Sequence, residues 1–140
     1  ILSGECQKVN SYLSSNFSIV GKVVKGNQIG NKIGFPTANI LVNNPYKILP
    51  KDGVYAVEVY VKEQQYFGML NIGNRPTVSD NEFVIEVYLF DFNDSIYNEE
   101  LKIVFIKRIR DERQFSSLDK LESQLRIDEI KCRKIFNLAR

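Results

Sequence analysis

The spacing of apolar side chains divides this chain into a short helix, a long region of strands and a closing helix. Leu2, Cys6, Val9 and Leu13 recur every three or four positions, which predicts a short amphipathic helix over residues 2–14. Patterns typical of strands then continue to about residue 110. Six runs rich in β-branched and aromatic residues carry them: 17–24, 38–42, 54–61, 65–72, 83–90 and 101–110.

A helical period returns after Arg113. The segment 116–119 offers a capping box at the start of this helix. Asp128 interrupts the apolar stripe, so we expect it to have a partner. The stripe comprises Leu118, Leu121, Leu125, Cys132 and Phe136. Six consecutive strands with too few helices for parallel crossovers predict a mainly β fold, an antiparallel barrel with a C-terminal helix.

Length and charge narrow the class of protein. A chain of 140 residues with 44% hydrophobic side chains is the size of one compact domain. Its net charge of +2 predicts no large surface for nucleic acid or for an anionic membrane. No apolar run approaches the roughly 18 residues of a membrane span, and no signal peptide opens the chain. We therefore expect a cytoplasmic protein without membrane contact.

The sequence contains no histidine. This absence excludes Ser/His and Cys/His nucleophiles and the common zinc sites. Cys6 and Cys132 lie far apart in segments of helical period, so we interpret them as two buried thiols. Acid–base chemistry must then come from Asp, Glu, Lys, Tyr or Cys.

Three glycines spaced four residues apart form the most informative local pattern. Gly26, Gly30 and Gly34 remove the Cβ atoms that would keep a polyanion away from backbone N–H groups. Thr37 and Asn39 follow, and both carry oxygen donors that Mg²⁺ accepts beside substrate phosphates. The stretch 26–39 thus predicts a cradle for a nucleotide and its metal. An ordinary glycine-rich turn is the alternative.

A carboxylate occupies the middle of one predicted strand. Glu86 shares a face with Val84 and Tyr88, while Ile85 and Val87 take the opposite face. Glu86 lies either on a solvated edge or in a pocket. In a pocket, partial desolvation would raise its pKa and make it a usable general base.

Two further segments carry polar groups next to strands. Residues 68–77 end a strand in a predicted turn with one arginine, where Asn71 supports a nucleotide or the arginine is simply solvated. Residues 109–115, between the last strand and the helix, contain several charged side chains and Phe115. Such corners often form the mobile wall of a site. Phe115 could equally be the hydrophobic staple of the helix.

Four motifs in this order resemble riboflavin kinase, the kinase half of bacterial bifunctional riboflavin kinase/FAD synthetase. The most specific is Gly-x-x-x-Gly-x-x-x-Gly-Phe-Pro-Thr-Ala-Asn at 26–39. Asn-Ile-Gly-x-Arg-Pro-Thr at 71–77, Glu86 on its strand and Ile-Arg-x-Glu-x-x-Phe at 109–115 follow. The resemblance spans nearly the whole chain, including the loop 91–101.

The resemblance implies a six-stranded Greek-key barrel that transfers the γ-phosphoryl of ATP to the ribityl 5′-hydroxyl of riboflavin, giving FMN. Glu86 would be the base, Thr37 and Asn39 would meet Mg²⁺, and the flavin would contact Arg110, Glu112 and Phe115. The residues implied for ATP and its phosphates are Gly26, Gly30, Lys32, Gly34, Pro36, Thr37, Asn39 and Asn71.

The loop 91–101 departs from the family pattern. Asp94 and Asn98 stand where glycines are common, and Ser95 where an aspartate is. Asn and Asp tolerate left-handed backbone, so the turns can persist. Asn31 replaces a frequent arginine, which leaves Lys32 as the nearest cation for the phosphates.

Bacterial relatives carry an adenylyltransferase domain before the kinase. Residues 1–14 resemble the remnant of the helix that joins the two domains, and the resemblance implies that residues 15–140 form the kinase domain. The chain alone is therefore expected not to make FAD. Two other classes stay open: a flavin-binding module without catalysis, and a small barrel that binds single-stranded nucleic acid.

Overall fold

The computed structural model describes residues 17–24, 37–42, 50–76, 81–92 and 96–137. All six predicted strands and the closing helix are present, whereas the predicted helix 2–14 lies outside the described residues. The strands are β1 (Ser18–Val24), β2 (Ala38–Val42), β3 (Gly53–Val61), β4 (Gln64–Pro76), β5 (Asn81–Leu89) and β6 (Glu100–Arg110). The helix is α3 (Leu118–Ile135).

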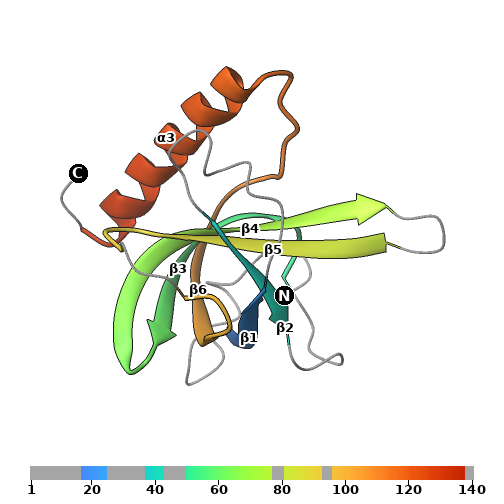
Figure 1. Cartoon of the computed structure of the whole chain (residues 1–140). Coiled ribbons are helices and arrows are strands. Elements are labelled where there is room, and N and C mark those ends of the chain that lie inside the picture. The colour runs from blue at the N-terminus through green and yellow to red at the C-terminus, as the bar shows by residue number, and fades with distance from the viewer. Residues whose placement is uncertain (1–16, 25–36, 43–49, 77–80, 93–95, 138–140) are drawn as a thin grey trace.

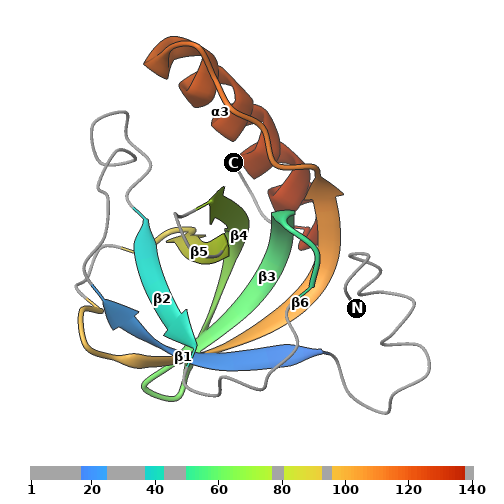
Figure 2. The same cartoon turned by 90° about the vertical axis from the view of Figure 1, so that its right-hand side faces the viewer.

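The six strands close into an antiparallel barrel in the order β1-β2-β5-β4-β3-β6 (Figures 1 and 2). Strands β3, β4 and β5 follow one another as hairpins, and β6 returns by a long connection to pair with β3. That order is a Greek key, as expected. Closure gives each strand a neighbour on both sides, although the outer ends of β4 and β5 pair only with each other.

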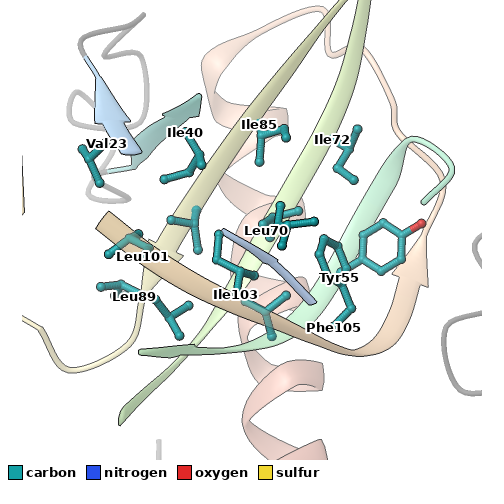
Figure 3. Close-up of a cluster of buried hydrophobic side chains, with 14 of the residues drawn as sticks. Val23, Ile40, Tyr55, Leu70, Ile72, Ile85, Leu89, Leu101, Ile103 and Phe105 are labelled. Atoms are coloured by element: carbon teal, nitrogen blue, oxygen red, sulfur yellow. The ribbon is translucent and has the colours of Figure 1, made fainter. Parts of the chain in front are cut away.

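Alternating side chains of the strands fill the barrel interior (Figure 3). The odd-numbered residues of β3 point inward, and Tyr55 meets Phe105 of β6 edge-on, with 5.1 Å between ring centroids. From β5, Ile85, Val87 and Leu89 join the same cluster, as the alternation predicts.

Helix α3 covers the outer side of the barrel near β3, β4 and β6 (Figures 1 and 2). Cys132 of the helix is buried against Val54 and Ala56 of β3 and against Met69 of β4. This second cluster explains why β3 begins with apolar residues on both faces. Leu118 does not belong to the buried stripe, because 47% of its surface is exposed.

Two local predictions are wrong by a few residues. Strand β4 does not end near Ile72 but continues to Pro76, paired with β5 through Arg75↔Glu82 and Pro76↔Asn81. The Gly73–Pro76 sequence is typical of a turn, but pairing with β5 outweighs that local preference. In Figure 1 these two strands extend beyond the rest of the barrel as a ribbon.

The start of α3 is shifted as well. Ser117 is the N-cap residue, and its hydroxyl accepts a hydrogen bond from the Lys120 backbone N–H over 3.2 Å. The predicted box began one residue earlier, at Ser116. The residue three positions after Ser117 is a lysine, so only half of a capping box forms.

Candidate functional site

Three polar side chains stand side by side on the outer face of the barrel. Glu86 on β5 pairs with Asn39 on β2 and, on its other side, with Asn71 on β4. Directly opposed residues of neighbouring strands have Cβ atoms about 5 Å apart. We call these residues the polar row; each of them is half-buried.

The position of β5 excludes one of the two interpretations of Glu86. Strand β5 lies between β2 and β4, so Glu86 is not on a sheet edge. Its neighbours Ile85 and Val87 point into the barrel core, which directs Glu86 to the outside. The solvated-edge interpretation is therefore wrong.

The polar row joins two other predicted parts of the site. Thr37 is half-buried and directly precedes β2, two positions before Asn39, on the side where the glycine-rich segment enters the strand. At the other end, Asn71 pairs with Val54, and Val54 pairs with Arg110 of β6. The row thus leads from the predicted phosphate side to the predicted flavin side.

Glu112 reaches across the outer face of β4. A Cβ atom added to Gly73 would lie 2.6 Å from its carboxylate Oε1 and 3.6 Å from the Asn71 side-chain nitrogen. The carboxylate therefore occupies the space that a side chain at position 73 would fill. This contact brings Glu112 next to the polar row, and it explains a glycine in the middle of a strand.

Arg110 makes a buried ion pair with the helix. Its Nε lies 2.9 and 3.0 Å from the two carboxylate oxygens of Asp128, and its Nη2 lies 2.8 Å from Oδ2. Asp128 has no exposed surface. The expected partner of Asp128 is therefore Arg110, and the pair fastens the end of β6 to α3.

Phe115 lies beneath two guanidinium groups. The Cζ atoms of Arg110 and Arg113 are 5.8 and 5.2 Å from its ring centroid. Phe115 is two residues before the N-cap Ser117, one position too early for a hydrophobic staple, so that interpretation is wrong.

A pocket of about 540 Å³ opens between residues 113–116 and the first half of α3. This volume lies in the range of roughly 300–1,000 Å³ that is usual for small-molecule sites. Of the predicted flavin residues, only Phe115 lines it; Arg110 and Glu112 do not. Its lining is Arg113, Gln114, Phe115, Ser116, Asp119, Lys120, Ser123, Gln124 and Ile127.

Metal binding rests on few protein groups. The described part of the chain has no cluster of three or more His, Cys, Asp or Glu residues. Thr37 and Asn39 offer hard oxygen donors near a carboxylate. Because Mg²⁺ is usually bound by one or two protein ligands together with substrate phosphates, this donor set fits Mg²⁺. Cys132 is a free buried thiol, and burial raises its pKa to about 12.

Several predicted residues lie outside the described part of the chain. They are Gly26, Gly30, Lys32, Gly34 and Pro36 of the phosphate cradle, and Asp94 and Ser95 of the variant loop. Asn98 is described and adopts a φ of 67°, as expected for a residue that replaces a glycine in a turn.

Sequence reasoning missed Gly73, Gln124 and Ile127. Gly73 was assigned to a turn, although an isolated glycine inside a strand pattern is also a signal of close approach. Nothing in the local pattern of α3 distinguished Gln124 and Ile127 from solvent-facing residues. Only their place beside the pocket marks them.

Comparisons with known proteins show which family this chain resembles. A family model described as riboflavin kinase (flavokinase) matches residues 13–136. The bifunctional riboflavin kinase/FMN adenylyltransferase of Escherichia coli K12 is 41% identical over 131 residues, which are 93% of this chain and 41% of that protein. The chain thus spans about two fifths of this relative's length. A protein of Bacillus subtilis named RNA-binding riboflavin kinase RibR is 43% identical over 122 residues, 86% of this chain and 51% of that protein.

Two solved structures resemble the fold. A crystal structure described as a macrolide-efflux protein from Streptococcus pneumoniae has a TM-score of 0.91 and 38% identity, covering 95% of this chain and 43% of that one. The riboflavin kinase of Trypanosoma brucei has a TM-score of 0.58 and 27% identity, covering 86% of this chain and 79% of that one. Among the described residues, no helix has the length and apolar character that crossing a membrane requires.

Proposed function

Because the chain belongs to the riboflavin kinase family, we propose that it transfers the γ-phosphoryl group of ATP to the ribityl 5′-hydroxyl of riboflavin, releasing FMN and ADP. The observation that carries this proposal is the polar row. Asn39, Glu86 and Asn71 come from three separate parts of the chain, and the barrel register aligns them. In this proposal the carboxylate of Glu86 lies between the phosphates of ATP and the acceptor hydroxyl of riboflavin.

The phosphates of ATP bind at the β2 end of the row in this proposal. Thr37 and Asn39 hold Mg²⁺ and the terminal phosphates there, with Gly26, Gly30, Lys32, Gly34 and Pro36 around the triphosphate. Mg²⁺, when bound, neutralises charge on the transferred oxygens. Since the transition state of phosphoryl transfer is loose, positioning and charge neutralisation are the main tasks of the protein.

Glu86 faces the attacking hydroxyl. Its carboxylate accepts a hydrogen bond from the 5′-hydroxyl, aligns the oxygen with the γ-phosphorus and receives the proton as the new P–O bond forms. Alignment of this kind is worth several kcal/mol in favourable cases, roughly 7–11 at the upper end. Asn71, the next member of the row, supports the same substrate group.

The flavin lies on the side of the β6–α3 corner, which we define as residues 110–115. Glu112 extends over Gly73 toward the row, so it is placed for the ribityl side of the substrate. Phe115 offers a ring face and borders the 540 Å³ pocket. We assign the isoalloxazine ring to this side and the ribityl chain to the path between Glu112 and Glu86.

The name of the bifunctional relatives includes a second activity, FMN adenylyltransferase. We propose that a full-length protein carries this activity in a separate upstream domain, joined through residues 1–14, and that this chain does not convert FMN to FAD. Cytoplasmic location and the absence of nucleic-acid binding remain predictions from composition.

The direct test mixes the purified chain with riboflavin, ATP and Mg²⁺ and follows FMN by chromatography. We expect FMN and ADP in equal amounts, no FAD, and loss of turnover when EDTA removes the metal. If the chain binds riboflavin but neither forms FMN nor binds Mg-ATP, it is instead a flavin-binding module. Salt-sensitive binding of an oligonucleotide would favour the nucleic-acid class.

A further inference from the structure

The corner and helix α3 are joined by a closed network of five side chains. Asp128 accepts hydrogen bonds from Arg110 on one side and, over 3.0 Å, from the Gln124 side-chain amide on the other. Gln124 in turn accepts a hydrogen bond of 3.2 Å from Arg113. The guanidinium groups of Arg110 and Arg113 both lie over the ring of Phe115, which closes the circle.

Asp128 is the most deeply buried member of this network. Its side chain has no exposed surface, and 14% of the Arg110 side chain is exposed. Arg113 is exposed and Phe115 and Gln124 are half-buried, so burial decreases toward the pocket. A charge held in this way has few alternative positions, because leaving its partner would strand it away from water.

Two chains of contacts lead from Asp128 to the ring of Phe115. One passes through Arg110, and the other through Gln124 and Arg113. A guanidinium group over an aromatic face is an attractive contact that depends on its distance from the ring. The position of Phe115 is therefore tied to two groups that Asp128 and Gln124 hold.

We propose that Asp128 is a positioning residue for the flavin: through Arg110 and Gln124 it holds Phe115 and the corner in the arrangement that binds riboflavin. Helix α3 is then part of the flavin-binding apparatus as well as a cover for the barrel. This inference rests on the proposed function, because it takes Phe115 as a flavin contact.

A second ion pair between α3 and the barrel provides a matched control. Arg133, five positions after Asp128, binds Asp91 beyond β5 at 3.0 Å, binds Glu129 at 2.8 Å and lies 4.7 Å above Phe90. Its side chain is only 9% exposed. R133Q therefore removes a comparably buried charge from the same helix without touching the corner.

The experiment compares D128N, Q124L and R133Q with the wild type. Riboflavin binding is measured by fluorescence quenching, KM for riboflavin and for ATP by FMN formation, and Tm by circular dichroism. We expect D128N to weaken riboflavin binding about tenfold and Q124L about threefold, with KM for ATP changed less than about twofold. R133Q should lower Tm while riboflavin binding stays within about twofold of the wild type.

Three results would overturn the proposal. The first is wild-type riboflavin affinity in both D128N and Q124L. The second is a loss of affinity in R133Q equal to that in D128N at a similar Tm, which would reduce the role of Asp128 to general stability. The third applies if D128N does not fold: unchanged riboflavin binding in Q124L would then overturn the proposal by itself. If the wild-type chain makes FMN while one of these three results is obtained, the proposed function stands and only the role of Asp128 is refuted. If the wild-type chain neither binds nor phosphorylates riboflavin, both proposals are refuted.

Discussion

The surroundings of Glu86 depend only in part on its own strand. Alternation along β5 directs it away from the core, and pairing on both sides gives it Asn39 and Asn71 as neighbours. A carboxylate in that position can accept a hydrogen bond from an alcohol without being exposed at an edge. Its proposed role is alignment of the acceptor hydroxyl as much as proton removal.

Removal of the charge at position 86 tests that role. We expect E86Q to lower kcat by more than about tenfold while riboflavin still binds, because the amide keeps the shape but cannot take the proton. E58Q is the matched control, since Glu58 lies on the outer face of β3 outside the polar row. Stopped-flow or chromatographic assays of FMN formation measure both variants. Unchanged turnover in E86Q would remove Glu86 from the base role.

Gly73 tests the placement of Glu112. In G73A the new methyl group would meet the carboxylate of Glu112, which is the flexible end of an exposed side chain and can move away. We expect little change in Tm and a rise in KM for riboflavin of about threefold to tenfold.

A double-mutant cycle with E112A makes the G73A result specific. If G73A acts by displacing the carboxylate, it adds nothing further once position 112 has no carboxylate, so the two effects are not additive. An equal G73A effect in the wild-type and E112A backgrounds would show that the methyl group obstructs the site directly.

At the scale of elements, the junction between β6 and α3 combines stability and site construction. The helix buries Cys132 against β3 and β4 and pairs Asp128 with Arg110. Five positions further along, the hydrogen bonds from Arg133 hold the pKa of Asp91 below its usual value. These contacts with the barrel lie in the C-terminal half of the helix, whereas its first turn borders the pocket beside Phe115.

The N-cap of α3, a contact within the start of the helix itself, is simple to test. S117A should lower the free energy of unfolding by about 1 kcal/mol, because the Lys120 backbone N–H loses its acceptor. S116A is the control: Ser116 precedes the cap, and its loss should cost less than about 0.5 kcal/mol. Urea unfolding followed by circular dichroism measures both. A larger loss in the free energy of unfolding for S116A than for S117A would show that Ser116 is the N-cap residue, as the sequence pattern predicted.

The whole molecule is a closed barrel whose stability comes mainly from one interior cluster. Among the described residues, sixteen buried side chains form this cluster, and all six strands contribute (Figure 3). The same arrangement creates the polar row, which exists only where β2, β5 and β4 lie together. Loss of interior packing should therefore affect folding and catalysis in one transition.

Two leucines make this prediction quantitative. Leu70 is fully buried in the barrel, whereas 60% of the surface of Leu41 is exposed. L70A should lower the free energy of unfolding by about 2–5 kcal/mol, from lost burial and the cavity that remains. L41A, the same change outside the barrel, should cost less than about 0.5 kcal/mol. Similar losses in the two variants would contradict the barrel interior described here.

Local signals account for the parts of the fold that were predicted correctly. Period-two alternation in 54–61 and 83–90 depends only on near neighbours, so it identified the strands and placed Glu86 on the face opposite Ile85 and Val87. The signals at 73–76 and at 116–119 are local too, but pairing with β5 and the docking of α3 outweighed them by a few residues. Local patterns are weakest where a distant segment supplies the deciding contact.

The amino-acid sequence by itself determined the six strands, the closing helix and the need of Asp128 for a partner. It also singled out Glu86, Thr37 and Asn39 as candidate site residues. Tertiary structure alone decided which residues meet: Asn39 and Asn71 beside Glu86, Glu112 over Gly73, and Arg110 as the partner of Asp128. The physical reason is the range of the interactions. Side-chain periodicity is set within a few residues, whereas register across a closed barrel depends on how the whole core packs.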